Sequence, residues 1–94
     1  MENTTDQELK LLNKAQEEAF KTTYNLYCTQ LIYYALKFVT NKADAEDIVA
    51  GVFINLYHSV ASGRQFQSRD HLRSFLFVAT RNAVFNHLSK SRRQ

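Results

Sequence analysis

The stretch AEDIVAGVFINLY, residues 45–57, decides the fold, because its apolar residues recur with the spacing of a helix that buries one face. That apolar stripe consists of Ala45, Ile48, Val49, Val52, Phe53, Leu56 and Tyr57. The carboxylates Asp44, Glu46 and Asp47 crowd the first turn, where the helix dipole favours negative charge. Asn41, with Asp44 three positions on, fits a variant capping box, so we expect a helix over residues 42–59.

Upstream of this helix, a stripe of large side chains spaced three and four residues apart predicts a long helix over residues 17–39. The stripe consists of Phe20, Tyr24, Tyr27, Leu31, Tyr34 and Phe38. Before it, Asp6 as a cap with Leu9 and Leu12 as the apolar side predicts a short helix over residues 6–14. We expect residues 13–16 to break or bend the chain between these two helices.

Downstream, Gly63 is a natural stop for the central helix, and residues 62–68 have the composition of a loop. Ser68 or Asp70 then caps a last helix over residues 69–89, and residues 90–94 are expected to fray. The sequence has no proline and only two glycines, so nothing forbids long helices. We therefore predict an all-α fold: one domain, residues 1–94, built as a compact bundle of about four helices.

Charge is distributed unevenly along the chain. Residues 1–63 contain five lysines and eight carboxylates, a balance of −3, whereas residues 64–94 contain seven cations and one carboxylate, a balance of +6. A basic end on a neutral-to-acidic body suggests that a polyanion binds at that end. A solubilising tail is the alternative interpretation of the same charges.

The last predicted helix has an apolar face that includes Leu72, Leu76 and Ala79, with Asn82 and Asn86 at its margin. One interpretation is that both amides bond to neighbouring backbone, because an unsatisfied amide would cost about 1–3 kcal/mol. The other is that they edge a polar pocket, since an asparagine amide pairs bidentately with the edge of an exposed base.

Cations and one aromatic residue lie beside these amides. Arg73 and Arg81 are two turns apart on a different side of the helix, a spacing suited to tracking a phosphate backbone. The preceding loop offers Arg64, Phe66 and Arg69, a minimal platform on which phenylalanine stacks a base and arginine holds phosphate. Phe66 is also suited to plug the end of the bundle, and both roles remain open.

Evidence for other chemistry is weak. His58, His71 and His87 have no metal-ligand spacing with one another or with Cys28, so no metal or cofactor is expected. The sequence contains no phosphate-binding glycine loop and no nucleophile elbow, so we do not expect an enzyme. A lone cysteine indicates a reducing compartment. No apolar run approaches the roughly 20 residues of a membrane helix and no signal peptide is visible, so we expect a cytoplasmic protein without membrane contact.

Five segments, taken in order, carry a family resemblance. They are AFKTTY (19–24), YYALKF (33–38), NKAD (41–44), AEDIVAGVFINLY (45–57) and LRSFLFVATRNAVFN (72–86). Together, over about residues 6–93, they resemble region 2 of the bacterial extracytoplasmic-function sigma factors. The resemblance implies a domain that binds core RNA polymerase and recognises and melts the promoter minus-ten element.

The resemblance also implies roles for particular residues. The central helix is expected to dock on the clamp helices of the largest polymerase subunit through Asp47, Ala50, Gly51, Ile54, Asn55 and His58. The loop and the last helix are expected to bind the non-template strand and capture a flipped base, with Phe66, Asn82 and Asn86 at the pocket. An anti-sigma factor is a further partner that the resemblance allows. Full-length members carry a second helical domain that reads the minus-35 element, and we expect this chain to lack it.

The chain departs from the family pattern at four positions. Ala50 and Gly51 replace a glutamine and an acid on the polymerase-facing side, Phe75 replaces a tryptophan, and Val78 replaces a basic residue. The first two changes remove polar groups from the docking side, and Val78 alters part of the DNA surface. The alternative function is a helical protein–protein interaction module whose basic tail is incidental.

Overall fold

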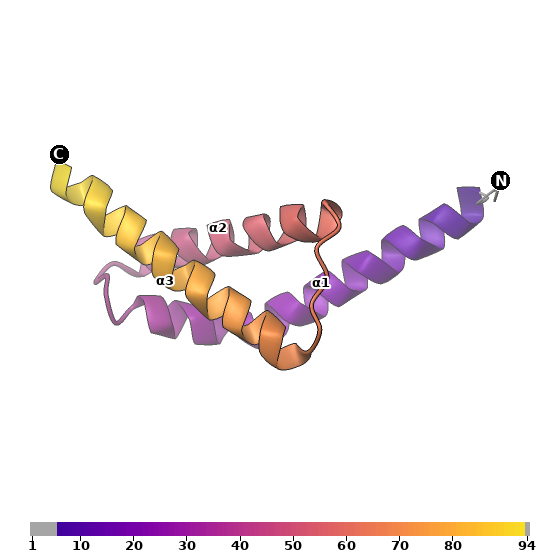
Figure 1. Ribbon diagram of the computed structural model, residues 1–94. Coiled ribbons are helices and arrows are strands. Elements are labelled where there is room, and N and C mark those ends of the chain that lie inside the picture. Colours follow the sequence, from indigo (N-terminus) through magenta and orange to yellow (C-terminus); the bar gives the residue numbers. More distant parts are fainter. Residues whose placement is uncertain (1–5, 94) are drawn as a thin grey trace.

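The computed structural model describes the backbone of residues 6–93 and the side chains of residues 14 and 16–90. Within this range the chain forms three helices, α1 (Asp6–Ala35), α2 (Lys42–Ala61) and α3 (Arg69–Arg93), and no strand (Figure 1). The all-α prediction is confirmed. The prediction of about four helices is wrong, because the first two expected helices are one.

Helix α1 runs without interruption through the predicted break at residues 13–16. That segment contains neither proline nor glycine, so nothing interrupts the backbone hydrogen bonds there. The helix ends at Ala35, earlier than predicted, and tighter bonds follow: the Lys37 N–H donates to the Tyr34 carbonyl at 3.1 Å and the Phe38 N–H to the Ala35 carbonyl at 2.9 Å. The expected cap at Asp6 and the contacts of Leu9 and Leu12 lie outside the described side chains.

Helix α2 has the predicted cap and the predicted stop. The Asn41 side-chain oxygen accepts from the backbone N–H groups of Ala43 at 2.8 Å and Asp44 at 3.4 Å. At the other end Gly63 has a φ of 102°, in the left-handed region that favours glycine. The N–H of Gly63 bonds the Val60 carbonyl and that of Arg64 bonds the Ser59 carbonyl, each at 3.0 Å, which is a Schellman motif.

Helix α3 is capped by Ser68 rather than Asp70, because the Ser68 hydroxyl accepts from the His71 N–H at 3.1 Å. The helix continues to Arg93, so the expected end at about residue 89 and the frayed tail from residue 90 are wrong. At its far end the imidazole of His87 lies 3.5 Å from the Asp44 carboxylate at the start of α2. This contact joins the beginning of one helix to the end of the next.

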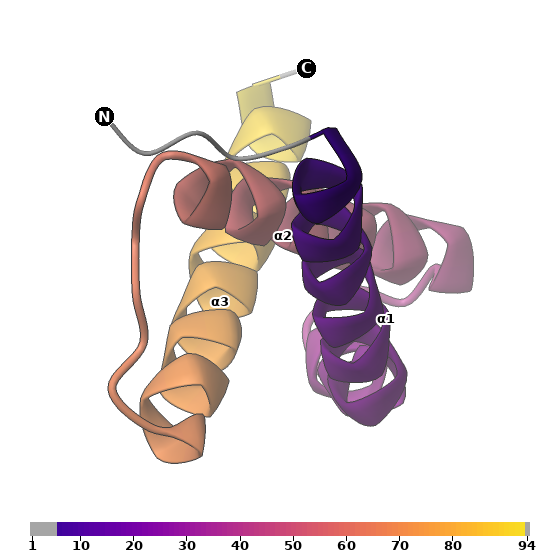
Figure 2. The same cartoon turned by 90° about the vertical axis from the view of Figure 1, so that its right-hand side faces the viewer.

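All three helices pack on one another, and the N-terminal part of α1 projects beyond the other two, so the molecule is elongated, 54 × 25 × 23 Å (Figure 1). Seen along the bundle, α1 and α3 run side by side and α2 runs across both of them (Figure 2). The predicted core residues of α2 are buried: Ala45, Ile48, Val49, Val52, Phe53 and Leu56. Tyr57, predicted to be buried with them, is 58% exposed.

Sequence periodicity located the core of α3 only in part. Leu76 is fully buried as predicted, but Thr80 and Val84, which follow it at intervals of four residues, are equally buried. The Thr80 hydroxyl donates to the Leu76 carbonyl at 2.8 Å, which satisfies it inside the bundle. The buried line of α3 is therefore rotated away from Phe75 and Ala79, which are left half-buried.

Candidate nucleic-acid interface

An open pocket of about 900 Å³ lies between the C-terminal half of α2, the loop after it and the middle of α3. The residues that line it are Asn55, His58, Ser59, Ser62, Gly63, Arg64, Phe75, Ala79, Asn82, Ala83 and Asn86. The small side chains of Ala79 and Ala83 leave the space, and polar groups surround it. Amide, imidazole, hydroxyl and guanidinium groups are the side chains that read base edges and hold phosphate.

Asn82 and Asn86 lie one turn apart on the wall of this pocket, and both side chains are exposed. The side-chain hydrogen bonds found among the described residues involve neither amide. The interpretation that they serve only to satisfy local backbone therefore finds no support. Their donors and acceptors remain available to a guest in the pocket.

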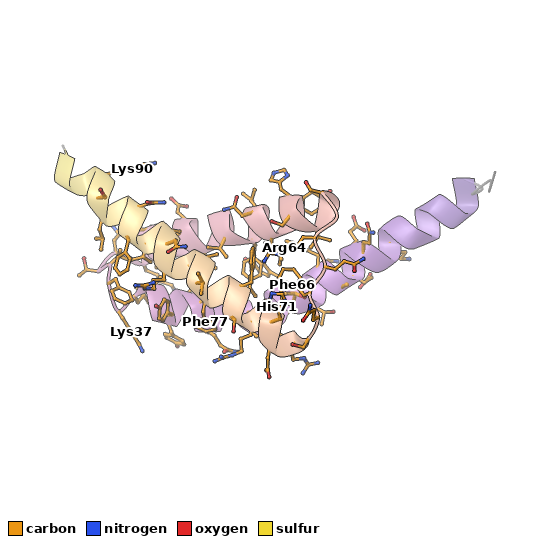
Figure 3. The ribbon with its side chains drawn as sticks, in the orientation of Figure 1. Lys37, Arg64, Phe66, His71, Phe77 and Lys90 are labelled. Carbon is orange, nitrogen blue, oxygen red and sulfur yellow. The ribbon has the colours of Figure 1, made fainter. Side chains whose placement is uncertain are left out.

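The loop before α3 is held by a cluster of rings and one cation, labelled in part in Figure 3. The Phe66 ring packs edge-on against Phe75 at 5.2 Å and His71 at 5.3 Å between centroids. The Arg64 guanidinium lies over both phenylalanine rings, 5.2 Å from Phe66 and 4.6 Å from Phe75. The Gln67 N–H donates to His71 Nδ1 at 3.4 Å, which fixes the loop to the first turn of α3.

Phe66 is half-buried and packs on the core, and it does not line the pocket. These contacts are those of a plug at the bundle end, one of the two roles that the sequence leaves open for this residue. Arg64, by contrast, lines the pocket while stacked on two rings. Stacking orients the guanidinium plane and leaves its edges free to donate hydrogen bonds.

The remaining predicted phosphate-binding arginines lie outside the pocket. Arg73 stacks over Phe77 at 4.7 Å and Arg81 over Phe85 at 5.3 Å, on the flank of α3 that faces α1. Arg69 is exposed at the first residue of α3. The structure thus separates the predicted DNA-binding residues into a pocket group, Arg64, Asn82 and Asn86, and a group of arginines beyond it.

The residues expected to bind polymerase also separate. Asn55 and His58 line the pocket together with Asn82 and Asn86. Ala50 and Ile54 instead line an apolar hollow of about 300 Å³, completed by Phe20, Tyr24, Phe53 and Tyr57. Asp47 is exposed, and a Cβ built on Gly51 would meet nothing within 4 Å. The outer face of α2 is therefore polar toward α3 and apolar toward α1.

Sequence reasoning did not include the α1 side chains Phe20 and Tyr24 in this surface, because their spacing assigned them to the core. Tyr24 is 42% exposed at the rim of the hollow. A side-chain hydrogen bond with Cys28 raises the pKa of the Tyr24 phenol above 10.0, and the charges of Cys28 and Glu46 and partial burial act in the same direction.

Two other kinds of site are not found in the part of the chain that the structure describes. No group of three or more His, Cys, Asp or Glu side chains is placed to hold a metal ion. None of the described helices combines the length and the apolar character needed to span a bilayer.

Residues 23–94 match the family model described as Sigma-70 region 2. This match covers most of the chain, and the chain belongs to the sigma-70 region 2 family. In sigma factors this region binds RNA polymerase and melts promoter DNA, and the family is not one of enzymes. Comparison with curated proteins and with solved structures found no match.

Proposed function

We propose that this chain recognises the promoter minus-ten element by capturing one flipped base of the non-template strand in the pocket between α2 and α3. The observation that carries the proposal is that Asn82 and Asn86 line one open pocket with Arg64, while the side-chain hydrogen bonds among the described residues involve neither amide. The sequence motifs further favour the extracytoplasmic-function group within the family.

The side chains of the pocket suit different parts of a nucleotide. The amides of Asn82 and Asn86 present both donors and acceptors, so they suit the Watson–Crick edge of an extruded base. Arg64, oriented by the rings of Phe66 and Phe75, suits the phosphate next to that base. Phe66 then acts by holding the loop and Arg64 in place, because its ring is packed on the core.

Contact with polymerase is assigned to the outer face of α2, toward the clamp helices of the largest subunit. Asp47 supplies an exposed charge in the second turn, and the hollow formed by Ala50 and Ile54 with Tyr57 accepts an apolar side chain. This surface suits a partner helix that is basic along one side and apolar along the other. The apolar hollow compensates for the polar side chains that Ala50 and Gly51 replace.

The base-capture proposal is tested by fluorescence anisotropy with non-template minus-ten oligonucleotides, each changed at one base. Asn82→Ala should flatten the preference at one position, since losing a good bidentate contact costs about 1–3 kcal/mol of discrimination. Asn25→Ala, which removes an exposed amide from α1, is the matched control and should keep the wild-type ranking. If Asn82→Ala also keeps that ranking, the base is read elsewhere.

The polymerase proposal is tested by pull-down of core polymerase. Asp47→Arg should weaken binding while leaving helicity unchanged, and Asp70→Arg, at the start of α3, serves as the charge-reversal control. Equal recovery of polymerase by wild type and Asp47→Arg counts against this face of α2. A chain that binds polymerase but no oligonucleotide, even at low salt, would instead be a protein–protein module.

A further inference from the structure

One imidazole lines the pocket between α2 and α3, although the family resemblance assigns it to polymerase. Asn55 and His58 are three residues apart on α2, so they lie on the same face of the helix. Both side chains are exposed, and they line the pocket together with Arg64, Asn82 and Asn86. The apolar hollow toward α1 shares no lining residue with this pocket. His58 is therefore placed to meet what enters the pocket.

The pocket is lined by positive and neutral groups alone. Its lining residues include no aspartate or glutamate, and Arg64 carries the one permanent charge among them. Neither of the ion pairs found among the described residues involves His58. A positive charge on His58 would therefore add to that of Arg64, with no carboxylate in the pocket wall to neutralise it.

Other titratable groups around His58 are few. On α2 itself, the Tyr57 ring lies edge-on at 5.8 Å between centroids, and Asp47 is about three turns away toward the start of the helix. On α1, Glu17 lines a groove that Tyr57 borders on its other side. Helix α3 contributes no titratable side chain to the pocket wall, and the loop contributes Arg64 alone.

An imidazole at this position has a charge that depends on the solution and on the guest. Imidazole changes charge between about pH 5 and pH 8. His58 belongs to the last turn of α2, where the helix dipole favours a cation. A phosphate in the pocket favours the protonated imidazole, as it favours the guanidinium of Arg64, because opposite charges attract. Proton uptake by His58 and phosphate binding then promote each other, and the coupling is reciprocal.

We infer that His58 is an anion-binding residue of the pocket: in its protonated form it holds, with Arg64, the phosphate of the captured nucleotide, so that capture takes up a proton. The inference rests on the proposed capture of a base, and it adds a group from α2 to the phosphate side of the pocket. Because the complex binds more protons than the free chain, affinity for the minus-ten strand rises as the pH falls.

The experiment measures anisotropy of a fluorescent non-template minus-ten oligonucleotide at about pH 8 and at about pH 5.5, at one ionic strength. The wild-type chain should bind at least about fivefold more tightly at the lower pH. His58→Gln, which keeps a hydrogen-bonding side chain without the charge, should change by less than about twofold between the two conditions. His87→Gln is the matched control, because His87 lies outside the pocket beside Asp44, and it should keep the wild-type pH dependence.

Two further measurements keep the test decisive if glutamine disturbs the fold. His58→Arg fixes the charge, so this variant should bind at the higher pH as tightly as wild type binds at the lower pH. A neutral methylphosphonate, moved one position at a time along the strand, should remove the pH dependence of wild-type binding at one phosphate, beside the base that the minus-ten panel identifies.

Persistence of the wild-type pH dependence in His58→Gln, or at every position of the methylphosphonate, overturns the inference. So does a loss of polymerase recovery by His58→Gln with unchanged oligonucleotide binding, because His58 then belongs to the polymerase side. Asn82→Ala separates this test from that of base capture. If Asn82→Ala keeps the base ranking while His58→Gln removes the pH dependence, base capture fails and His58 remains a phosphate ligand. The reverse pair of results refutes His58 alone.

Discussion

The two flanks of α3 differ although they share one buried line of Leu76, Thr80 and Val84. On the flank toward α2, Ala79 and Ala83 are small, so a pocket opens and the amides of Asn82 and Asn86 border it. On the flank toward α1, phenylalanines fill the equivalent space and arginines stack on them. Side-chain volume therefore decides which flank is hollow and which is filled, and the hollow flank is the one proposed to hold the base.

The largest expected effect removes the support that both flanks share. Leu76→Ala should lower the free energy of unfolding by about 2–5 kcal/mol, because Leu76 is fully buried between the flanks and its loss leaves a cavity. Base preference and salt-dependent binding should then decline together. Denaturant titration measures the loss, with Val78→Ala, an exposed site on the same helix, as a control expected to change stability by less than about 0.5 kcal/mol.

Filling the pocket should make one flank resemble the other. Ala79→Leu places a branched side chain among the pocket residues, so discrimination among minus-ten oligonucleotides should fall by about 1–3 kcal/mol. The salt dependence of oligonucleotide binding should stay as in wild type, because Arg73 and Arg81 on the other flank are not altered. Retention of the base ranking by a folded Ala79→Leu protein would mean that the pocket does not hold the base.

Gly63 affects the pocket flank alone, through the loop that carries Arg64. Gly63→Ala should destabilise the fold by about 1 kcal/mol, because the residue sits at a φ of 102° where a side chain is strained. Minus-ten affinity should also fall, because Arg64 shifts with the loop. Gly51→Ala is the informative contrast: Gly51 lies inside α2 with open space around it, so thermal stability should rise instead.

The smallest expected effect concerns the arginines on the flank of α3 that faces α1. Arg73→Ala removes one phosphate contact, so the log–log slope of oligonucleotide affinity against salt should flatten by about 0.7. The base ranking should not change, because Arg73 lies outside the pocket. Lys42→Ala, which removes an exposed cation at the start of α2, should leave the slope as it is in wild type. An equal flattening of the slope in both variants would show that the slope follows net charge and not a phosphate contact of Arg73.

The features that sequence predicted best are those set by neighbouring residues. Asn41 caps α2 and Gly63 ends it, since capping depends on the side chain and φ of one or two residues. The apolar spacing of residues 45–57 predicted six of seven side chains on the buried face. The seventh, Tyr57, lies at the margin of the stripe, where Phe20 of α1 meets its ring edge-on and leaves it 58% exposed.

Predictions that depended on what a helix packs against were less accurate. Phe66 suited a stacking platform or a plug, and only the structure shows that its ring packs against Phe75 and His71. The outer face of α2 was predicted as one polymerase-binding surface, and its neighbours divide it between a polar pocket and an apolar hollow. Arginine and phenylalanine alternate at positions 73, 77, 81 and 85, so the sequence contains a signal for the flank of α3 that faces α1. Periodicity alone does not reveal that Tyr34 and Phe38 pack against the phenylalanines of that flank.

The sequence by itself determined the helices, their caps and the charge of each segment, because these follow from backbone preferences and side-chain types within a few positions. Only the tertiary structure decided which polar side chains stay without partners and which rings remain exposed. Those properties depend on the volume that a neighbouring helix fills, as Ala79 and Phe77 illustrate on opposite flanks of α3. A pocket is a property of at least two elements, and no single stretch of sequence contains it.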